Sequence, residues 1–118
     1  MTPPSPYVIS YFTRDLAACR LFYEGLVGLA VHTEVPDVYF LCGAGPWRLQ
    51  FPRIDPDRLG RDTVSSGLVL FGVETENEFA DLQDRLRSAT TVYDDGCRDP
   101  DGRVVMVQVF DPAAPFHD

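Results

Sequence analysis

His32 and Glu34 have the residue types and spacing for acid–base chemistry. They stand two residues apart in a stretch rich in β-branched residues, so on a strand both side chains would project from one face. An imidazole beside a carboxylate can serve as a general base near neutral pH. A strand histidine more often has no catalytic role, so both residues are weak catalytic candidates. Two donors are also fewer than the ligands of a zinc site.

The sequence identifies no catalytic partners for the residues that could act as a nucleophile. His117 is the only other histidine, and no Ser-His-Asp arrangement can be argued from the sequence. Cys97 precedes Arg98, whose charge favours a thiolate, but we interpret Cys97 as structural. The three cysteines lack C-x-x-C spacing and predict reduced thiols in the cytoplasm. All ten basic residues are arginine, which excludes Schiff-base catalysis by lysine.

The acidic charge narrows the classes of partner. The 118 residues carry a net charge of −8, with an isoelectric point near 4.5. Nucleic acids and anionic membrane surfaces bind basic patches, so we expect neither as a partner. No apolar run is long enough to span a bilayer, and the opening MTPPSP does not resemble a signal peptide. A cationic small molecule is compatible with this charge.

The first half of the chain predicts one helix among four strands. Asp15 is the expected N-cap, and Gly28 stands where a left-handed cap would end the helix. The helix has an apolar stripe at helical spacing, made of Leu16, Cys19, Phe22, Tyr23 and Leu26. Strands are expected at residues 7–12, 29–34, 38–42 and 47–51.

The second half predicts the same order of elements. Thr75 and Glu78 have the spacing of a capping box at a helix start. The apolar stripe of that helix is Phe79, Leu82, Leu86 and Ala89. Strands are expected at residues 67–73, 90–93 and 103–110, with a brief edge strand at 97–98. The sequence Asp99-Pro100-Asp101-Gly102 predicts a tight turn before the last strand.

The element order is therefore βαβββ written twice. The modules span residues 7–51 and 67–110, with a linker at 52–66 and a tail at 111–118. The length suits one α+β domain, residues 1–118, built from two modules.

Three motifs give the chain a family resemblance. They are RDLAACRLFYEGLVGL at residues 14–29, the strand and capped helix at 67–86, and DPDGRVVMVQ at 99–108. In this order they resemble the vicinal-oxygen-chelate superfamily, which contains glyoxalase I, bleomycin-resistance proteins and extradiol dioxygenases. The resemblance implies two βαβββ modules that form an incompletely closed, cupped β-barrel around a ligand cavity. It also implies a homodimer.

The resemblance further implies where a metal site would lie. Metal enzymes of the family take one ligand from the first strand and one from the last strand of each module. The corresponding residues in this sequence are Val8, Gln50, Leu68 and Met106. Valine and leucine have no donor atom, and methionine offers only a soft thioether. We therefore expect no metal and no other cofactor.

Strand alternation predicts which side chains line the cavity. A short hairpin at residues 43–46 would place Tyr39 opposite Gln50 and Leu41 opposite Arg48. A turn at Pro36 would add His32 and Glu34 to the same face. The predicted ligand-binding residues are Ser10, Glu34, Tyr39, Trp47, Arg48, Gln50, Leu68, Met106, Gln108 and Phe110.

Two functions follow from this lining. The first is a metal-free binding protein that sequesters a hydrophobic or cationic small molecule, such as an antibiotic or secondary metabolite. The second is a metal-independent isomerase, lyase or cyclase of secondary metabolism that uses His32, Glu34 or Arg48. A third, weaker option is a degenerate domain that only pairs with another chain.

Overall fold

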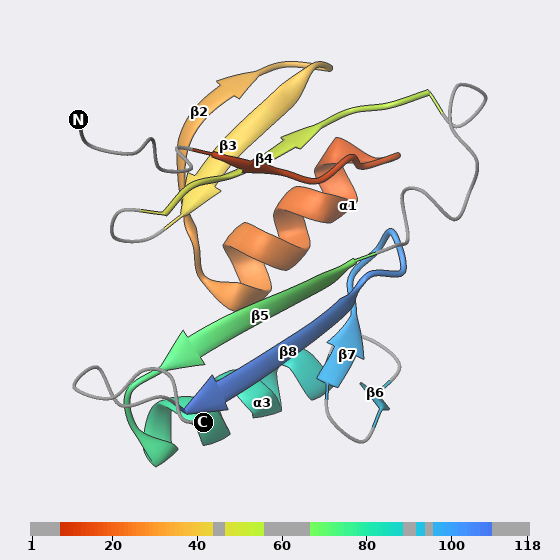
Figure 1. The fold of residues 1–118 in the computed structure, drawn as a ribbon. Coiled ribbons are helices and arrows are strands. Elements are labelled where there is room, and N and C mark those ends of the chain that lie inside the picture. Colours follow the sequence, from red (N-terminus) through yellow and green to blue (C-terminus); the bar gives the residue numbers. More distant parts are fainter. Residues whose placement is uncertain (1–7, 44–46, 56–66, 89–91, 94–95, 110–118) are drawn as a thin grey trace, which may run out of the picture. The chain divides into compact units, whose positions relative to one another are not determined.

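The computed structural model describes residues 8–43, 47–55, 67–88, 92–93 and 96–109. The chain divides into two compact units, Met1–Val64 and Ser65–Asp118, and each is described by itself. Both units contain a four-stranded sheet and a helical segment (Figure 1). No helix among the described residues is long and apolar enough to cross a membrane.

The sheet of the first unit has the strand order β1-β4-β3-β2. Its strands are β1 (Ile9–Ser10), β2 (Ala30–Val35), β3 (Tyr39–Gly43) and β4 (Leu49–Pro52). β1 runs parallel to β4, and the other neighbours are antiparallel. β1 is shorter than predicted, but its ladder continues because the Tyr11 and Thr13 amides donate to Gln50 O and Pro52 O.

The helix of the first unit begins at the predicted cap. Asp15 Oδ1 accepts a hydrogen bond from the Ala18 amide at 3.1 Å, and α1 spans Leu16–Arg20. The helix continues as a π-helix, η1 (Leu21–Val27), a widening that the sequence pattern did not predict. It ends at Gly28, whose φ of 92° lies in the left-handed region that glycine adopts without strain.

An aromatic core joins this helix to the sheet. Tyr23 and Phe51 are fully buried, and their rings stack with centroids 4.4 Å apart. Phe40 stacks on Phe51 from the neighbouring strand at 5.1 Å. Cys19 and Phe22 of the predicted stripe are also buried. The helix therefore covers the sheet face that carries Phe40 and Phe51.

The second unit repeats this arrangement. Its elements are β5 (Leu68–Val73), α3 (Glu76–Arg87), β6 (Val92–Tyr93), β7 (Gly96–Arg98) and β8 (Val104–Val109). The strand order β5-β8-β7-β6 corresponds to that of the first unit. Thr75 caps α3, since its hydroxyl accepts from the Glu78 amide at 3.1 Å and donates to Glu78 Oε1 at 2.9 Å. The α+β class and the two βαβββ modules are confirmed.

One expectation about the second sheet is wrong. The strand around Cys97 was predicted at the edge, but β7 lies between β8 and β6. The reason is that β6 adds a further antiparallel pair outside β7. The Cys97 side chain is buried and pairs in register with the buried Val105. The predictions for residues 56–66, Ala89, Phe110 and the tail at 111–118 fall outside the described residues.

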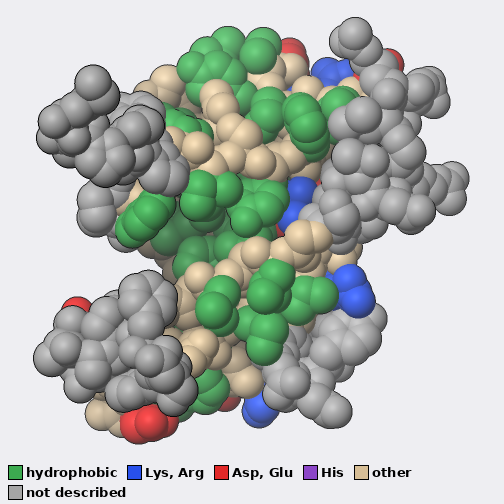
Figure 2. All heavy atoms as spheres, in the orientation of Figure 1, with side chains coloured by type: hydrophobic (Ala, Val, Ile, Leu, Met, Phe, Trp, Pro, Cys, Tyr) green, Lys and Arg blue, Asp and Glu red, His purple; other side chains and the backbone are tan. Residues whose placement is uncertain are grey.

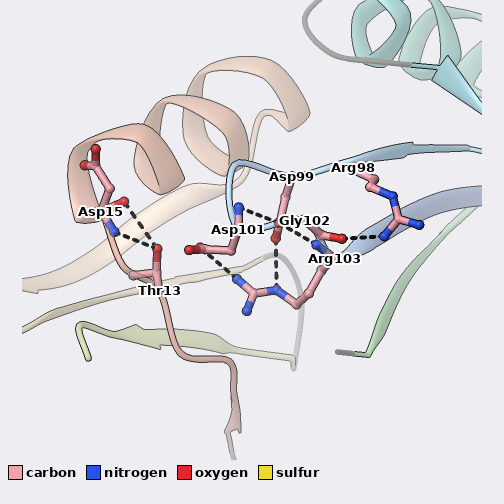
Figure 3. A network of polar contacts seen from close by, with 7 residues as sticks. All are labelled: Thr13, Asp15, Arg98, Asp99, Asp101, Gly102 and Arg103. Carbon is pink, nitrogen blue, oxygen red and sulfur yellow. Dashed lines mark hydrogen bonds and ion pairs between the residues drawn. The ribbon is translucent and has the colours of Figure 1, made fainter. Parts of the chain in front are cut away.

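The predicted turn before β8 is held by a buried ion network (Figure 3). Asp99 Oδ1 accepts from the Asp101 and Arg103 amides at 2.9 and 3.0 Å. The Arg103 guanidinium donates to Asp99 Oδ2 at 2.9 Å and to Asp101 Oδ2 at 3.2 Å. Gly102 has a φ of 91°, which the reversal requires. This turn sets the start of β8, the strand that carries Met106.

Candidate binding faces

The face of the first sheet that its helix leaves uncovered is both polar and apolar. Gln50 of β4 pairs in register with Ser10 of β1 and Leu41 of β3. The Ser10 hydroxyl donates to Gln50 Oε1 at 2.8 Å. Alternation places Tyr39, one pair along from Phe40, on this same side. We call this surface the first binding face.

The hairpin between β3 and β4 differs in register from the prediction. Leu41 rather than Tyr39 lies opposite Gln50, and Tyr39 lies opposite Pro52. The shift of two residues keeps both side chains on the predicted face. At the end of β3, Trp47 O stands only 2.3 Å from the position that a Cβ on Gly43 would take, so a side chain at residue 43 would clash. Trp47 and Arg48 precede β4, and the Arg48 guanidinium donates to Trp47 O at 3.0 Å.

The expectation that Glu34 shares this face is wrong. Glu34 pairs with the buried Phe40, on the helix side of the sheet, and forms an ion pair with Arg20. Two local features cause this. Asp37, with a φ of 63°, closes a turn that pairs Val35 with Tyr39, and a bulge between Val31 and Thr33 leaves His32 without a register partner.

This ion pair removes the carboxylate that the general-base hypothesis places beside His32. It needed the Glu34 carboxylate beside an exposed imidazole, but that carboxylate contacts the Arg20 guanidinium. The catalytic role of His32 stays a prediction.

The second sheet also has an uncovered face, and it is more apolar. β5 and β8 pair in parallel, with Leu68 opposite Val104, Leu70 opposite Met106, and Gly72 opposite Gln108. The alternate residues of these strands, Val69, Val105 and Val107, are buried. Leu68 and Leu70 are 48% and 52% exposed. We call this surface, formed by Leu68, Leu70, Val104, Met106 and Gln108, the second binding face.

The figures show this face directly. α3 lies behind β5 and β8 in Figure 1, so the side toward the viewer is the one without a helix. Figure 2 shows hydrophobic side chains gathered over these two strands. The predicted ligand-binding residues Leu68, Met106 and Gln108 belong to this face by register.

The charged residues on both faces are arginines. Arg48 alternates with Gln50 on the first face, and Arg98 pairs with Val104 on the second. Arg98 also donates to Gly102 O at 2.6 Å. No carboxylate occupies a position on either face among the strand residues that the structure describes. The set of ligand-binding residues predicted from the sequence does not include Arg98, although alternation from Cys97 along β7 would have placed it on the second binding face.

The residues at the family's metal positions do not fit a metal. In the first unit, Val8 has no donor and the Gln50 oxygen already accepts from Ser10. In the second unit, Leu68 has no donor and Met106 offers a thioether, a poor ligand for hard or borderline divalent cations. Within the described ranges, no three His, Cys, Asp or Glu side chains gather closely enough to hold a metal ion.

Comparison with known proteins finds likeness in structure alone. No family model matches the chain, and no curated protein matches it. Lactoylglutathione lyase from Agrobacterium tumefaciens is similar with a TM-score of 0.71 and 20% identity, over 92% of this chain and 95% of that one. The fold is that of the glyoxalase/bleomycin-resistance/dioxygenase proteins.

Two further solved structures share this fold. A glyoxalase/bleomycin resistance protein/dioxygenase family enzyme from Burkholderia phytofirmans PsJN has a TM-score of 0.67 and 20% identity, over 87% of this chain and 96% of that one. TnmS3, an antibiotic binding protein from Streptomyces sp. CB03234, has a TM-score of 0.65 and 18% identity, over 92% and 98%. The fold recognised from three short motifs is thereby confirmed.

Within this glyoxalase-type fold, Cys42 is a buried thiol rather than a reactive one. Burial raises its pKa to about 12, and the nearby Glu24 charge acts in the same direction. The folded state therefore keeps its proton at pH values where the unfolded chain loses it. The stabilising contribution is complete below the ordinary thiol pKa and is lost as the pH rises toward about 12.

We expect Cys42→Ala to reduce the alkaline loss of stability. The measurement is the fall in the free energy of unfolding between pH 8 and pH 10.5, by urea titration of both proteins. The wild-type protein should show the larger fall, because only it contains this protonated buried thiol. Equal falls in the two proteins would contradict the raised pKa.

Proposed function

We propose that the protein binds an apolar small molecule on its uncovered sheet faces without a metal. The observation that supports this most is the exposure of Leu68 and Leu70, 48% and 52%, on a face that α3 does not cover. A contiguous apolar patch left exposed on a sheet face is typical of a ligand or partner site. Polar groups are few, as is usual for small-molecule sites.

The charges favour a neutral or anionic ligand over a cationic one. Glu34 was the carboxylate that would have met a cation, and it lies on the other side of the sheet. Arg48 and Arg98 remain at the binding faces, and a guanidinium is well suited to a phenolate or carboxylate. The ligand class is therefore an apolar body with a hydroxyl or acidic group.

Sequestration is the role we propose for this binding, with antibiotic resistance as its purpose. Support comes from TnmS3, an antibiotic binding protein with the same fold. A homodimer and a cytoplasmic location remain part of the proposal. The metal-independent enzyme is the weaker alternative, because His32 lacks the carboxylate neighbour that acid–base catalysis was expected to use.

Three probes with one apolar body test the ligand class. Calorimetry of chelator-treated protein should detect 2-naphthol and 2-naphthoate, with 2-naphthylmethylamine binding about tenfold more weakly to these faces, a difference of about 1.4 kcal/mol. The recovered ligand should be chemically unchanged by mass spectrometry, since sequestration breaks no bond. Preferred binding of the amine, with amide shifts in β4, β5 and β8, would contradict the charge argument.

Leu70→Glu tests the location. A carboxylate in place of this exposed leucine removes about 2 kcal/mol of apolar contact with the bound ligand and should weaken 2-naphthol binding at least tenfold. Leu21→Glu is the matched control, because Leu21 is 74% exposed and lies on η1. Equal affinity in both variants would show that the second binding face does not hold the ligand.

A further inference from the structure

A separate pocket lies on the helix side of the first unit. Its volume is about 290 Å³, and it opens between the start of α1 and the tip of the β2–β3 hairpin. The lining residues are Leu16, Ala17, Arg20, Glu34, Val35, Pro36, Asp37, Tyr39 and Phe40. This pocket contains Glu34, the residue that the bulge in β2 moves away from the binding faces.

The charged side chains around the pocket include more carboxylates than guanidinium groups. Arg20 Nε donates to Glu24 Oε1 at 3.0 Å, and its Nη1 donates to Glu34 Oε2. Two carboxylates thus share one guanidinium. Asp37, at the hairpin tip, adds another carboxylate that is exposed. The pocket wall itself has one cation and two anions, the opposite of the charge on the binding faces.

The remaining wall is apolar. Leu16 and Ala17 line it from α1, and Val35 and Pro36 line it from the hairpin. Phe40 is 1% exposed and forms part of the buried core, and the half-buried Tyr39 lines the pocket from β3. An apolar wall beside carboxylates is a favourable setting for an organic cation with an apolar body.

We propose that this pocket binds a small organic cation with an apolar body, of the arylalkylamine class. The ammonium group pairs with Glu34 and Asp37, and the apolar body lies against Leu16 and Pro36. The site does not rest on the proposed function, since it selects the opposite charge and shares only Tyr39 with the first binding face. Its volume is at the small end for ligand sites, so a compact amine suits it.

The test is a nuclear magnetic resonance titration of the full chain with 2-phenylethylamine. The amides of Ala17, Val35 and Asp37 should shift, with a dissociation constant on the order of 1 mM for so small a ligand. The neutral isostere 2-phenylethanol is the ligand control and should bind about tenfold more weakly. Equal shifts from the alcohol, or shifts confined to other residues, would overturn the proposal.

Two variants separate the charge from the shape of the site. Asp37→Asn keeps a residue that tolerates positive φ and should weaken amine binding about three- to tenfold. Asp84→Asn removes the same charge from the exposed side of α3 and should leave the affinity unchanged. Ala17→Leu keeps a good helix former and fills the pocket, so binding should fall more than tenfold. Unchanged affinity in Asp37→Asn or Ala17→Leu would overturn the proposal.

A third variant distinguishes this site from the proposed function. Leu70→Glu alters the second binding face and should leave the 2-phenylethylamine titration unchanged. Loss of amine binding in that variant would place the amine on the sheet face and contradict a separate site. Failure of the naphthol experiments would leave the amine result unaffected, since the two sites share no residue apart from Tyr39.

Discussion

Replacing Arg103 with methionine should destabilise the second unit by about 3–5 kcal/mol. The Arg103 side chain is 1% exposed and lies between the carboxylates of Asp99 and Asp101, which are 0% and 3% exposed. Methionine retains the apolar stem but leaves both carboxylates buried without their cation. The cost of uncompensated buried charge is what makes the effect large.

The chain provides a matched control for this prediction. Arg85 and Asp81 form an ion pair with the same i, i+4 spacing and a similar N–O distance, 3.0 Å against 2.9 Å. Those side chains are 42% and 68% exposed, against 1% and 0% for Arg103 and Asp99, so Arg85→Met should change the free energy of unfolding by at most about 1 kcal/mol. Urea unfolding at neutral pH, followed by amide exchange within β7 and β8, measures both variants. Equal losses of stability in Arg103→Met and Arg85→Met would contradict the role assigned to burial.

Replacing Phe51 with alanine should cost the first unit about 3–5 kcal/mol. Phe51 is fully buried, and its ring stacks against Tyr23, Phe40 and Tyr11 with centroid distances of 4.4, 5.1 and 6.3 Å. Removal of the ring leaves a cavity between helix and sheet that aromatic neighbours on rigid strands cannot close.

Trp47→Ala serves as the control for the loss of aromatic area. Trp47 is larger than Phe51 but exposed, so its removal should change stability by about 0.5 kcal/mol or less. Amide exchange in β3 and β4 reports on the first unit and separates its opening from that of the second. A Phe51→Ala protein as stable as Trp47→Ala would contradict the aromatic core.

Local signals predicted much of this fold. Asp15 and Thr75 stand at helix starts because their short polar side chains satisfy backbone amides there, and both caps are observed. The turn at Asp99 was predicted from its own residue types and is observed with the expected glycine conformation at Gly102. Such features depend on a few neighbouring residues, so one sequence suffices to predict them.

Features that depend on distant partners were harder to predict. The bulge near His32 is a property of the pairing between β2 and β3, and alternation alone put Glu34 on the wrong face. The π-helix at Leu21–Val27 has the same apolar residues as an ordinary helix would have. The burial of Arg103 had one usable signal in the sequence, namely the two aspartates that stand two and four residues before it.

Chemical-shift mapping with 2-naphthol in the presence of a chelator tests the central claim most directly. We expect the amides of Ser10, Gln50, Leu68, Leu70 and Met106 to shift, and added Zn²⁺ to leave the affinity unchanged. Shifts that avoid these strands, or that arise only after metal is added, would contradict a metal-free ligand site on the uncovered sheet faces.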